Sequence, residues 1–153
     1  MNRWASEAAG ARAKPATVLL EVSNLTKHYP VRKDVFSRVS GQVHAVDDIS
    51  FWIAEGETLG LVGESGCGKS TTGKTILKLI DPTAGTIQWR GRRIDQLSSG
   101  EMRPYRRELQ VVFQDPYSSL NPRMRAADIV AEPIRNFESA AASEIHDRVA
   151  SLF

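Results

Sequence analysis

The chain has 153 residues, of which 41% are hydrophobic and 25% charged, a balance typical of a globular domain and not of a collagen-like or disordered chain. The single cysteine, Cys67, excludes an internal disulfide and a zinc site built only from thiolates, so no oxidising compartment is needed. The apolar runs are far shorter than the roughly 18 residues of a membrane-spanning helix, and a net charge of +2 does not indicate a nucleic-acid-binding domain.

The first part of the chain predicts a tail and a pair of strands. Residues 1–16 lack the apolar core of a signal peptide, and we expect a disordered tail. Residues 17–29 alternate weakly between apolar and polar side chains, carry β-branched residues and end before Pro30, which favours a strand. Residues 42–57 form a second strand region that ends in a Glu-Gly-Glu turn, and the two strands are expected to pair as a hairpin.

The middle of the chain predicts buried strands around a helix. Residues 58–63, TLGLVG, are almost wholly apolar, as in a strand buried on both faces of a parallel sheet. Residues 69–80 place apolar side chains at helical spacing, and Pro82 and Gly85 are expected to end that helix. Three shorter elements follow: a strand at 86–91, a short helix at 98–107 and a second buried strand at 108–113.

The last part of the chain predicts a loop followed by two helices. Residues 114–123 are rich in proline, serine and asparagine and follow a predicted strand, at the end where ligands bind in open α/β sheets. Residues 124–137 and 139–153 are helical in composition, with Ser139 or Ser143 as the expected N-cap of the second helix. The apolar stripe expected to pack this helix consists of Ile145, Val149 and Leu152 or Phe153.

Residues 63–70, GESGCGKS, match the phosphate-binding pattern G-x-x-x-x-G-K-[ST] at every fixed position. A predicted apolar strand precedes the motif and a predicted helix follows it, which is the context that the pattern requires. Glycines allow successive backbone N–H groups to point at a polyphosphate, which then lies at the helix N-terminus. The sequence therefore predicts a nucleoside triphosphate site, and the alternative is a glycine turn that happens to precede a lysine.

The side chains of the motif have separate predicted tasks. Lys69 would reach the β- and γ-phosphate oxygens, the Ser70 hydroxyl would bind Mg²⁺, and Thr71 would add a hydroxyl near the α-phosphate. Cys67 occupies a variable position of the loop and is interpreted as a small filler. His28 and His44 have no metal-ligand spacing along the chain, and His146 is interpreted as a surface position on a helix.

A phosphate loop alone does not separate a kinase, a GTPase, a helicase and a transporter ATPase. The stretch from AVDDISF through the loop to GTI, followed by QVVFQDPYSSLNPRM, resembles the ATP-binding subunits of ABC transporters, most closely those of oligopeptide and dipeptide importers. The resemblance covers residues 18–153 and implies an α/β fold: part of a P-loop nucleoside triphosphate hydrolase core, an antiparallel β subdomain and the start of a helical subdomain. The implied divisions are a tail at 1–16, the nucleotide-binding core with the β subdomain at 17–113, and the Q-loop with the beginning of the helical subdomain at 114–153.

The resemblance also implies roles for individual residues. Gln114 corresponds to the Q-loop glutamine, which in the family reaches the Mg²⁺ and the attacking water, and Tyr29 corresponds to the aromatic residue that stacks on adenine; turn formation and strand-end packing are the respective alternatives. Lys69 and Gln114 are thus the implied catalytic residues, and Ser70 and Gln114 the implied Mg²⁺ ligands. The implied residues that bind ATP are Tyr29, Gly63, Ser65, Gly66, Cys67, Gly68, Lys69, Ser70 and Thr71.

The function implied is that of an ATPase subunit, peripheral at the cytoplasmic face of the inner membrane, that couples ATP hydrolysis to the import of peptides or similar small solutes. Its partners would be integral membrane permease subunits, a second ATP-binding subunit, identical or different, and indirectly a solute-binding protein. The signature motif and the catalytic carboxylate pair of the family have no counterpart in these residues. We therefore expect a truncated chain that does not turn ATP over by itself.

Two alternatives remain at this point. Six arginines between positions 90 and 107 allow a nucleic-acid-linked ATPase of the same superfamily, although they lack interleaved aromatic residues and no nucleic acid is expected as a partner. The other alternative is a remnant that binds nucleotide without catalysis.

Overall fold

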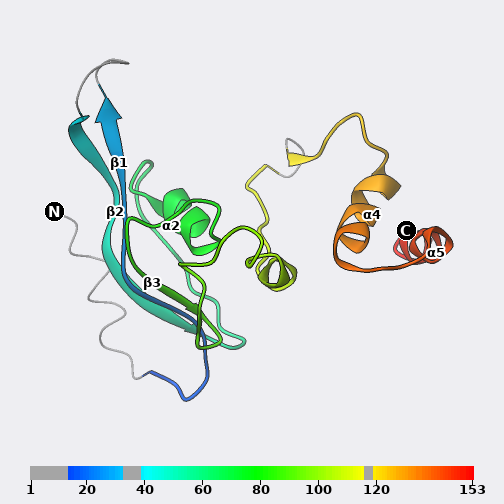
Figure 1. The fold of residues 1–153 in the computed structure, drawn as a ribbon, viewed down its shortest axis with the longest axis horizontal. Coiled ribbons are helices and arrows are strands. Elements are labelled where there is room, and N and C mark those ends of the chain that lie inside the picture. The colour runs from blue at the N-terminus through cyan, green and yellow to red at the C-terminus, as the bar shows by residue number, and fades with distance from the viewer. Residues whose placement is uncertain (1–13, 33–38, 116–118) are drawn as a thin grey trace. The chain divides into compact units, whose positions relative to one another are not determined.

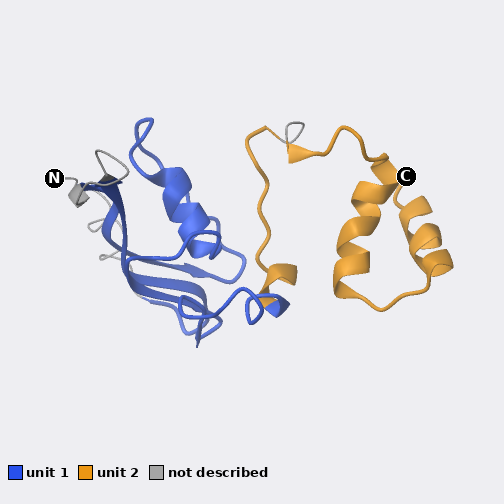
Figure 2. Cartoon of the chain, turned by 45° about the horizontal axis from the view of Figure 1, so that its top comes forward, with its two compact units in different colours: residues 1–104 blue, residues 105–153 orange. Residues whose placement is uncertain are grey.

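The computed structural model describes residues 14–32, 39–115 and 119–153 (Figure 1). The chain divides into two compact units, Met1–Pro104 and Tyr105–Phe153, called the first and the second unit below (Figure 2). Residues 1–13 of the predicted tail lie outside the described residues. The predicted domain boundaries at 16/17 and 113/114 stay predictions.

The first unit contains a four-stranded antiparallel sheet in the order β2-β1-β3-β4. Its strands are β1 (Val18–Arg32), β2 (Val39–Ala54), β3 (Ala84–Trp89) and β4 (Arg92–Arg93). The antiparallel pairing of β1 with β2 confirms the predicted hairpin, but the predicted end before Pro30 was wrong, because Pro30 pairs with Gln42 and β1 continues to Arg32. Strand β3 confirms a strand in the region predicted at 86–91, although it begins at Ala84 and ends at Trp89. Strand β4 was not predicted, because two arginines carry no apolar alternation.

The register of β1 against β2 shifts at several points. Asn24 on β1 and Asp48 on β2 have φ values of 50° and 51° at two of these shifts, and the Asn24 side-chain amide donates a 2.8 Å hydrogen bond to the Asp48 carboxylate. Between Lys27 and His28, β2 has one extra residue, Ala45. Bulges of this kind bend a strand and redirect its side chains.

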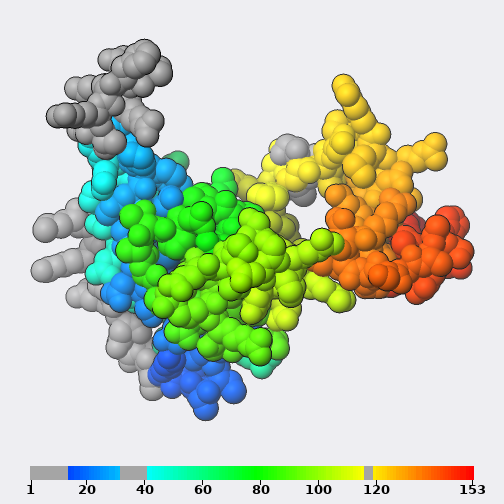
Figure 3. Space-filling model, viewed as in Figure 1, coloured from blue at the N-terminus to red at the C-terminus, as the bar shows by residue number. Residues whose placement is uncertain are grey.

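The core of the first unit combines side chains of the sheet with side chains from the segments that follow β3. Its fully buried apolar side chains include Leu25, Ile87, Ile94 and Met102. Helix α2 (Lys69–Ile76) contributes Thr72 and Thr75, whose hydroxyls donate to the backbone oxygens of the preceding turn. In the space-filling view, the green residues of α2 lie beside the blue and cyan residues of the long strands (Figure 3).

Helix α2 ends at Ile76, so the prediction that it continues to residue 80 and stops at Pro82 and Gly85 was wrong. Lys78 adopts φ 54°, its N–H donates to the Thr75 oxygen at 3.0 Å, and the Leu79 N–H donates to the Lys74 oxygen at 2.9 Å. These two bonds form the Schellman motif that closes a helix. The apolar spacing continued past this point, but the backbone had already left the helix.

The buried strands predicted at 58–63 and 108–113 were also wrong, since neither segment forms a strand. Val62 is 94% exposed and Val112 is 91% exposed. A strand of a parallel sheet needs neighbours that accept and donate its ladder hydrogen bonds. Within the described residues neither segment belongs to the sheet, so the apolar composition is present without the pairing.

The region predicted as a helix at 98–107 forms turns and a short 3₁₀ helix, η1 (Pro104–Arg107). The Ser98 hydroxyl and N–H both bond to the Glu101 carboxylate, at 2.6 and 2.9 Å. Proline is tolerated at the first position of η1 because the N–H that it lacks has no partner within the first helical turn.

The second unit packs two helices, α4 (Ala126–Phe137) and α5 (Ala142–Ala150). Their contact buries Ala131, Ile145 and Val149. The prediction of Ser139 or Ser143 as the N-cap was wrong, because Ala141 holds that position and no side chain caps the helix. Leu152 and Phe153, which were predicted to extend the packing stripe, are 69% and 80% exposed, because α5 has already ended.

Among the described residues, no helix combines the length and apolarity needed to cross a membrane.

The buried carboxylate of Asp95 bonds to strand β3 through Ile87 and to strand β4 through Arg93. It is 4% exposed, accepts the Ile87 N–H at 3.0 Å and pairs with the Arg93 guanidinium at 2.7 Å. Burial raises the pKa of this carboxyl, but the hydrogen bonds from Arg93 and Ile87 lower it by more, so the pKa lies below the ordinary 3.8. The charged form is therefore the one that the fold stabilises.

We expect Asp95→Asn to lower the free energy of unfolding by about 1.5–3 kcal/mol at pH 7, the range for hydrogen bonds to a charged group. Because the folded-state pKa is depressed, this stabilisation is complete above the ordinary pKa and is lost as the pH falls through the folded-state value. The stability gap between the parent and the variant, measured by urea unfolding, should therefore narrow as the pH falls below 3.8. Asp147→Asn, at an 84% exposed carboxylate, is the control and should change little. A gap that stays constant down to acidic pH would contradict this role.

Candidate functional site

The loop of residues 63–68 connects the exposed apolar segment 58–62 to α2. It has glycines where the backbone turns sharply. Gly66 and Gly68 have φ values of 82° and 96°, which favour glycine strongly. Gly68 is the N-cap of α2, and its carbonyl accepts the Thr72 N–H at 2.8 Å. The loop therefore opens directly onto a helix N-terminus, where unpaired N–H groups and the helix dipole favour an anion.

Two glycines of the loop also permit close approach. A Cβ on Gly68 would lie 2.0 Å from the Ala45 carbonyl oxygen of β2, so the loop rests against the extra residue in that strand. A Cβ on Gly63 would lie 2.5 Å from the Cys67 sulfur. Cys67, which we interpreted as a small filler, is thus packed against the first glycine of the loop.

The Lys69 side chain folds back over the loop. Its ammonium donates to the Gly63 carbonyl at 2.7 Å and to the Glu64 carbonyl at 2.5 Å, and lies 3.5 Å from the Cys67 sulfur. This position brings the positive charge to the mouth of the phosphate loop. A phosphate that enters the loop must compete with two carbonyl oxygens for this ammonium.

The hydroxyl residues of the motif lie on the same loop and first helical turn. Ser65 and Ser70 are exposed, and Thr71 is half-buried. The exposed Ser70 hydroxyl is a hard oxygen donor of the kind that Mg²⁺ prefers.

Tyr29 lies on β1 opposite Val43 and is 37% exposed. The Lys27 ammonium lies 5.0 Å from the centroid of its ring, a cation–π distance. The ring is thus accessible for stacking but already has a cation near its face. Its role toward adenine stays a prediction.

Gln114 belongs to the second unit, where it is exposed and lies outside helices and strands. Its predicted role toward Mg²⁺ and water stays a prediction, because the structure describes each unit by itself.

The sequence analysis missed one cluster. His28 lies directly opposite His44 across β1 and β2, and both rings contact Asp47. Hydrogen bonds, first to His28 and then to His44, hold the pKa of the Asp47 carboxyl below its ordinary value of 3.8. No spacing along the chain indicates this cluster, and only the strand register could have revealed it.

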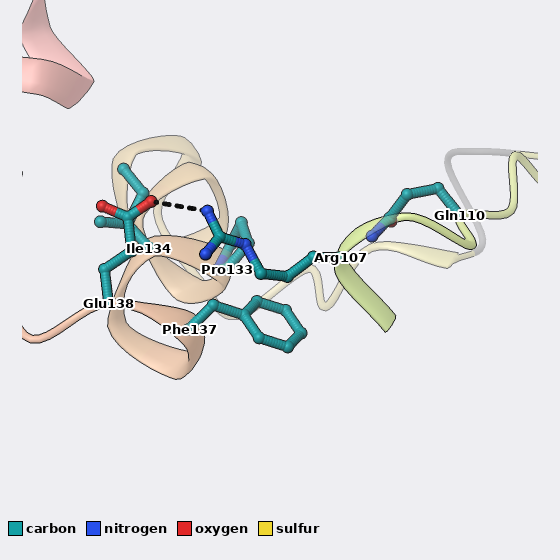
Figure 4. Close-up of a pocket in the computed structure, with 6 residues that line it drawn as sticks. All are labelled: Arg107, Gln110, Pro133, Ile134, Phe137 and Glu138. Atoms are coloured by element: carbon teal, nitrogen blue, oxygen red, sulfur yellow. Dashed lines mark ion pairs between the residues drawn. The ribbon is translucent and has the colours of Figure 1, made fainter. Parts of the chain in front are cut away.

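A shallow hollow in the second unit is a different feature (Figure 4). Its lining residues are Arg107, Gln110, Pro133, Ile134, Phe137 and Glu138. Arg107 pairs with Glu138 at 3.6 Å, and Glu138 also accepts a 2.5 Å hydrogen bond from Arg148. The charges of the hollow are therefore already paired, and it contains none of the predicted site residues.

Comparison with known proteins identifies relatives of this chain. It is 52% identical over 120 residues to the probable peptide ABC transporter ATP-binding protein y4tS of Sinorhizobium fredii, and the match covers 78% of this chain and 34% of that protein. It is 45% identical over 142 residues to the glutathione import ATP-binding protein GsiA of Pectobacterium atrosepticum, covering 93% of this chain and 22% of that protein. The chain thus spans only a minor part of the length of these relatives.

The structure is similar to solved ATP-binding cassettes. The dimeric cassette MJ0796 in a post-hydrolysis state, bound to ADP and Pi, matches with a TM-score of 0.68 and 27% identity, over 86% of this chain and 54% of that chain. The protein cbiO1 of Clostridium perfringens, part of the ABC transporter complex cbiONQ, matches with a TM-score of 0.64 and 26% identity, over 88% and 49%. The family described as ABC transporter matches residues 46–152, well over half of the chain. The chain therefore belongs to the ABC transporter family, and its fold is part of the P-loop ATPase fold of that family's ATP-binding cassettes.

Proposed function

We propose that the chain is part of an ATP-binding subunit that couples ATP hydrolysis to the import of peptides or similar small solutes. The observation that carries the proposal is the loop at 63–70, in which two left-handed glycines and the Lys69 ammonium lie at the N-terminus of α2. The relatives named for peptide and glutathione transport support the class of cargo. Full-length members of the family are ATPases.

In this proposal the loop residues hold the triphosphate and the cation. The backbone N–H groups of Gly66, Gly68 and Lys69 would contact phosphate oxygens, and the Lys69 ammonium would exchange its carbonyl partners for them. The Ser70 hydroxyl and the Gln114 amide oxygen are each a hard oxygen donor of the kind that Mg²⁺ prefers, and both would bind the cation that neutralises charge on the phosphates. Tyr29 would stack on the adenine.

The proposed assembly pairs this subunit with a second ATP-binding subunit at the cytoplasmic face of the inner membrane, beneath integral permease subunits. The similar cassette MJ0796 is a dimer, which supports the pairing. A solute-binding protein would contribute only indirectly.

The arginine cluster gives little support to a nucleic-acid partner. Arg90 pairs with Glu55 at 3.6 Å, Arg93 with Asp95 at 2.7 Å and Arg107 with Glu138 at 3.6 Å. Guanidinium groups that already face carboxylates contribute less to a phosphate-binding surface.

The experiment that tests the proposal compares nucleotides in the presence of Mg²⁺. We expect the full chain to bind ATP and ADP, and to bind AMP at least about tenfold more weakly, because a charge-assisted bond to the β-phosphate contributes more than about 1.4 kcal/mol. Calorimetric titration or equilibrium dialysis with labelled nucleotides measures all three. Equal affinities for AMP and ATP, or no saturable ATP binding by a folded chain, would overturn the proposed site.

A further inference from the structure

The cluster of His28, His44 and Asp47 lies outside the predicted nucleotide site. The two imidazole rings stack across the strands with centroids 3.9 Å apart and planes 26° apart. The Asp47 carboxylate reaches both, with one oxygen 3.2 Å from His28 Nε2 and the other 3.5 Å from His44 Nδ1. One ligand atom from each of the three residues lies within 4.8 Å of the others.

These distances fit the ligand shell of a divalent transition metal. Zn²⁺ binds imidazole nitrogen and carboxylate oxygen at about 2.0–2.2 Å with tetrahedral geometry, which separates neighbouring ligand atoms by roughly 3.3–3.5 Å. The two carboxylate oxygens of Asp47 lie at about this distance from the histidine nitrogens, one at 3.2 Å from His28 and the other at 3.5 Å from His44. The His44 side chain is 55% exposed, so its ring has room to turn toward a shared ion.

Within the cluster, His28 is fixed by its surroundings, whereas Asp47 is accessible to water. The His28 backbone N–H donates to the Thr83 hydroxyl at 3.0 Å, and the His28 side chain is only 17% exposed. Asp47 is 65% exposed, so water can complete the coordination. The extra residue Ala45 in β2 is what brings His44, two residues before Val46, opposite His28.

We propose that His28, His44 and Asp47 form a binding site for a divalent transition-metal ion, with Zn²⁺ as the representative ion and water in the remaining coordination position. Imidazole nitrogen favours such ions over Mg²⁺, so this site and the Mg²⁺ of the nucleotide are chemically distinct. The ion would link β1 to β2 on both sides of Ala45, the residue against which Gly68 rests. Binding it stabilises the folded sheet, because the three ligands come together only when the strands pair.

The test measures Zn²⁺ binding by the full, tag-free chain after removal of metals by a chelator. We expect the chain to bind one equivalent of Zn²⁺ saturably, as monitored by competition with a chromophoric chelator. We also expect Zn²⁺ to raise the thermal unfolding temperature. His44→Gln and Asp47→Asn should each weaken binding at least about tenfold, since each removes a ligand. Both side chains are more than half exposed, so far-UV circular dichroism should match that of the parent chain.

His146→Gln provides the matched control. His146 also lies 3.5 Å from a carboxylate, that of Asp147, but the described residues place no third ligand with this pair. Its substitution should leave Zn²⁺ affinity unchanged. The proposal is overturned if Zn²⁺ affinity is the same in His44→Gln and Asp47→Asn as in the parent, if binding is lost instead in Cys67→Ser, or if the folded chain binds no Zn²⁺ at all.

Discussion

Substitution Gly68→Ala is expected to lower the free energy of unfolding by about 2–5 kcal/mol and to abolish detectable ATP binding. Two costs combine at this position. A side chain at φ 96° costs about 1–2 kcal/mol, and the new Cβ would lie 2.0 Å from the Ala45 carbonyl oxygen, which is backbone and cannot rotate away. Relieving such an overlap typically costs a further 1–3 kcal/mol or so, through displacement of either the loop or β2.

Urea unfolding followed by tryptophan fluorescence measures the stability, since Trp52 and Trp89 both lie in the sheet. Gly73→Ala is the matched control: Gly73 lies inside α2, and a Cβ there would meet nothing within 4 Å. The same methyl group should stabilise the chain at position 73 by about 0.5–1 kcal/mol, because alanine favours a helix over glycine. Equal stability of the two variants would show that the loop does not rest on β2.

The antiparallel part of the fold could be predicted because its signals are local. Apolar and polar side chains alternate along β1 and along β2, and the two strands follow each other in the sequence. Their pairing could therefore be predicted without reference to distant parts of the chain. The segments 58–63 and 108–113 are different. Their apolar composition indicates burial, but a strand forms only against neighbours, and the described residues supply none for them.

The phosphate loop and the histidine cluster differ in the same way, because one depends on local sequence and the other on strand pairing. The phosphate loop is contiguous, so its glycines and Lys69 could be identified from spacing alone. The cluster of His28, His44 and Asp47 depends on a bulge at Ala45 that shifts the register by one residue. The sequence does not indicate that shift, and a register without it would place Ala45 opposite His28.

The folded-back position of Lys69 could not be predicted either, and it bears on nucleotide affinity. The ammonium donates to the carbonyls of Gly63 and Glu64. Phosphate binding must replace these bonds, so the net contribution of Lys69 is the difference between phosphate and carbonyl partners. Phosphate oxygens carry full charge and make the stronger hydrogen bonds, which leaves a net gain.

Lys69→Ala is therefore expected to weaken ATP binding by about 10- to 100-fold, the range for loss of a charge-assisted hydrogen bond to phosphate. Lys69→Arg should recover only part of this loss, because a planar guanidinium does not fit a position built for a compact ammonium. Titration of each variant with ATP in the presence of Mg²⁺ gives the affinities, and urea unfolding checks that the fold is kept.

Lys74→Ala is the matched control, since Lys74 lies on the same helix, is exposed and carries the same charge away from the loop. It should change ATP affinity less than about twofold, because an exposed charge is screened by solvent and salt. If Lys69→Ala and Lys74→Ala weaken ATP binding equally, the lysine acts only through net charge. The carbonyl contacts of Lys69 would then have no part in binding, and the phosphate loop would have to hold the nucleotide through its backbone N–H groups and the N-terminus of α2 alone.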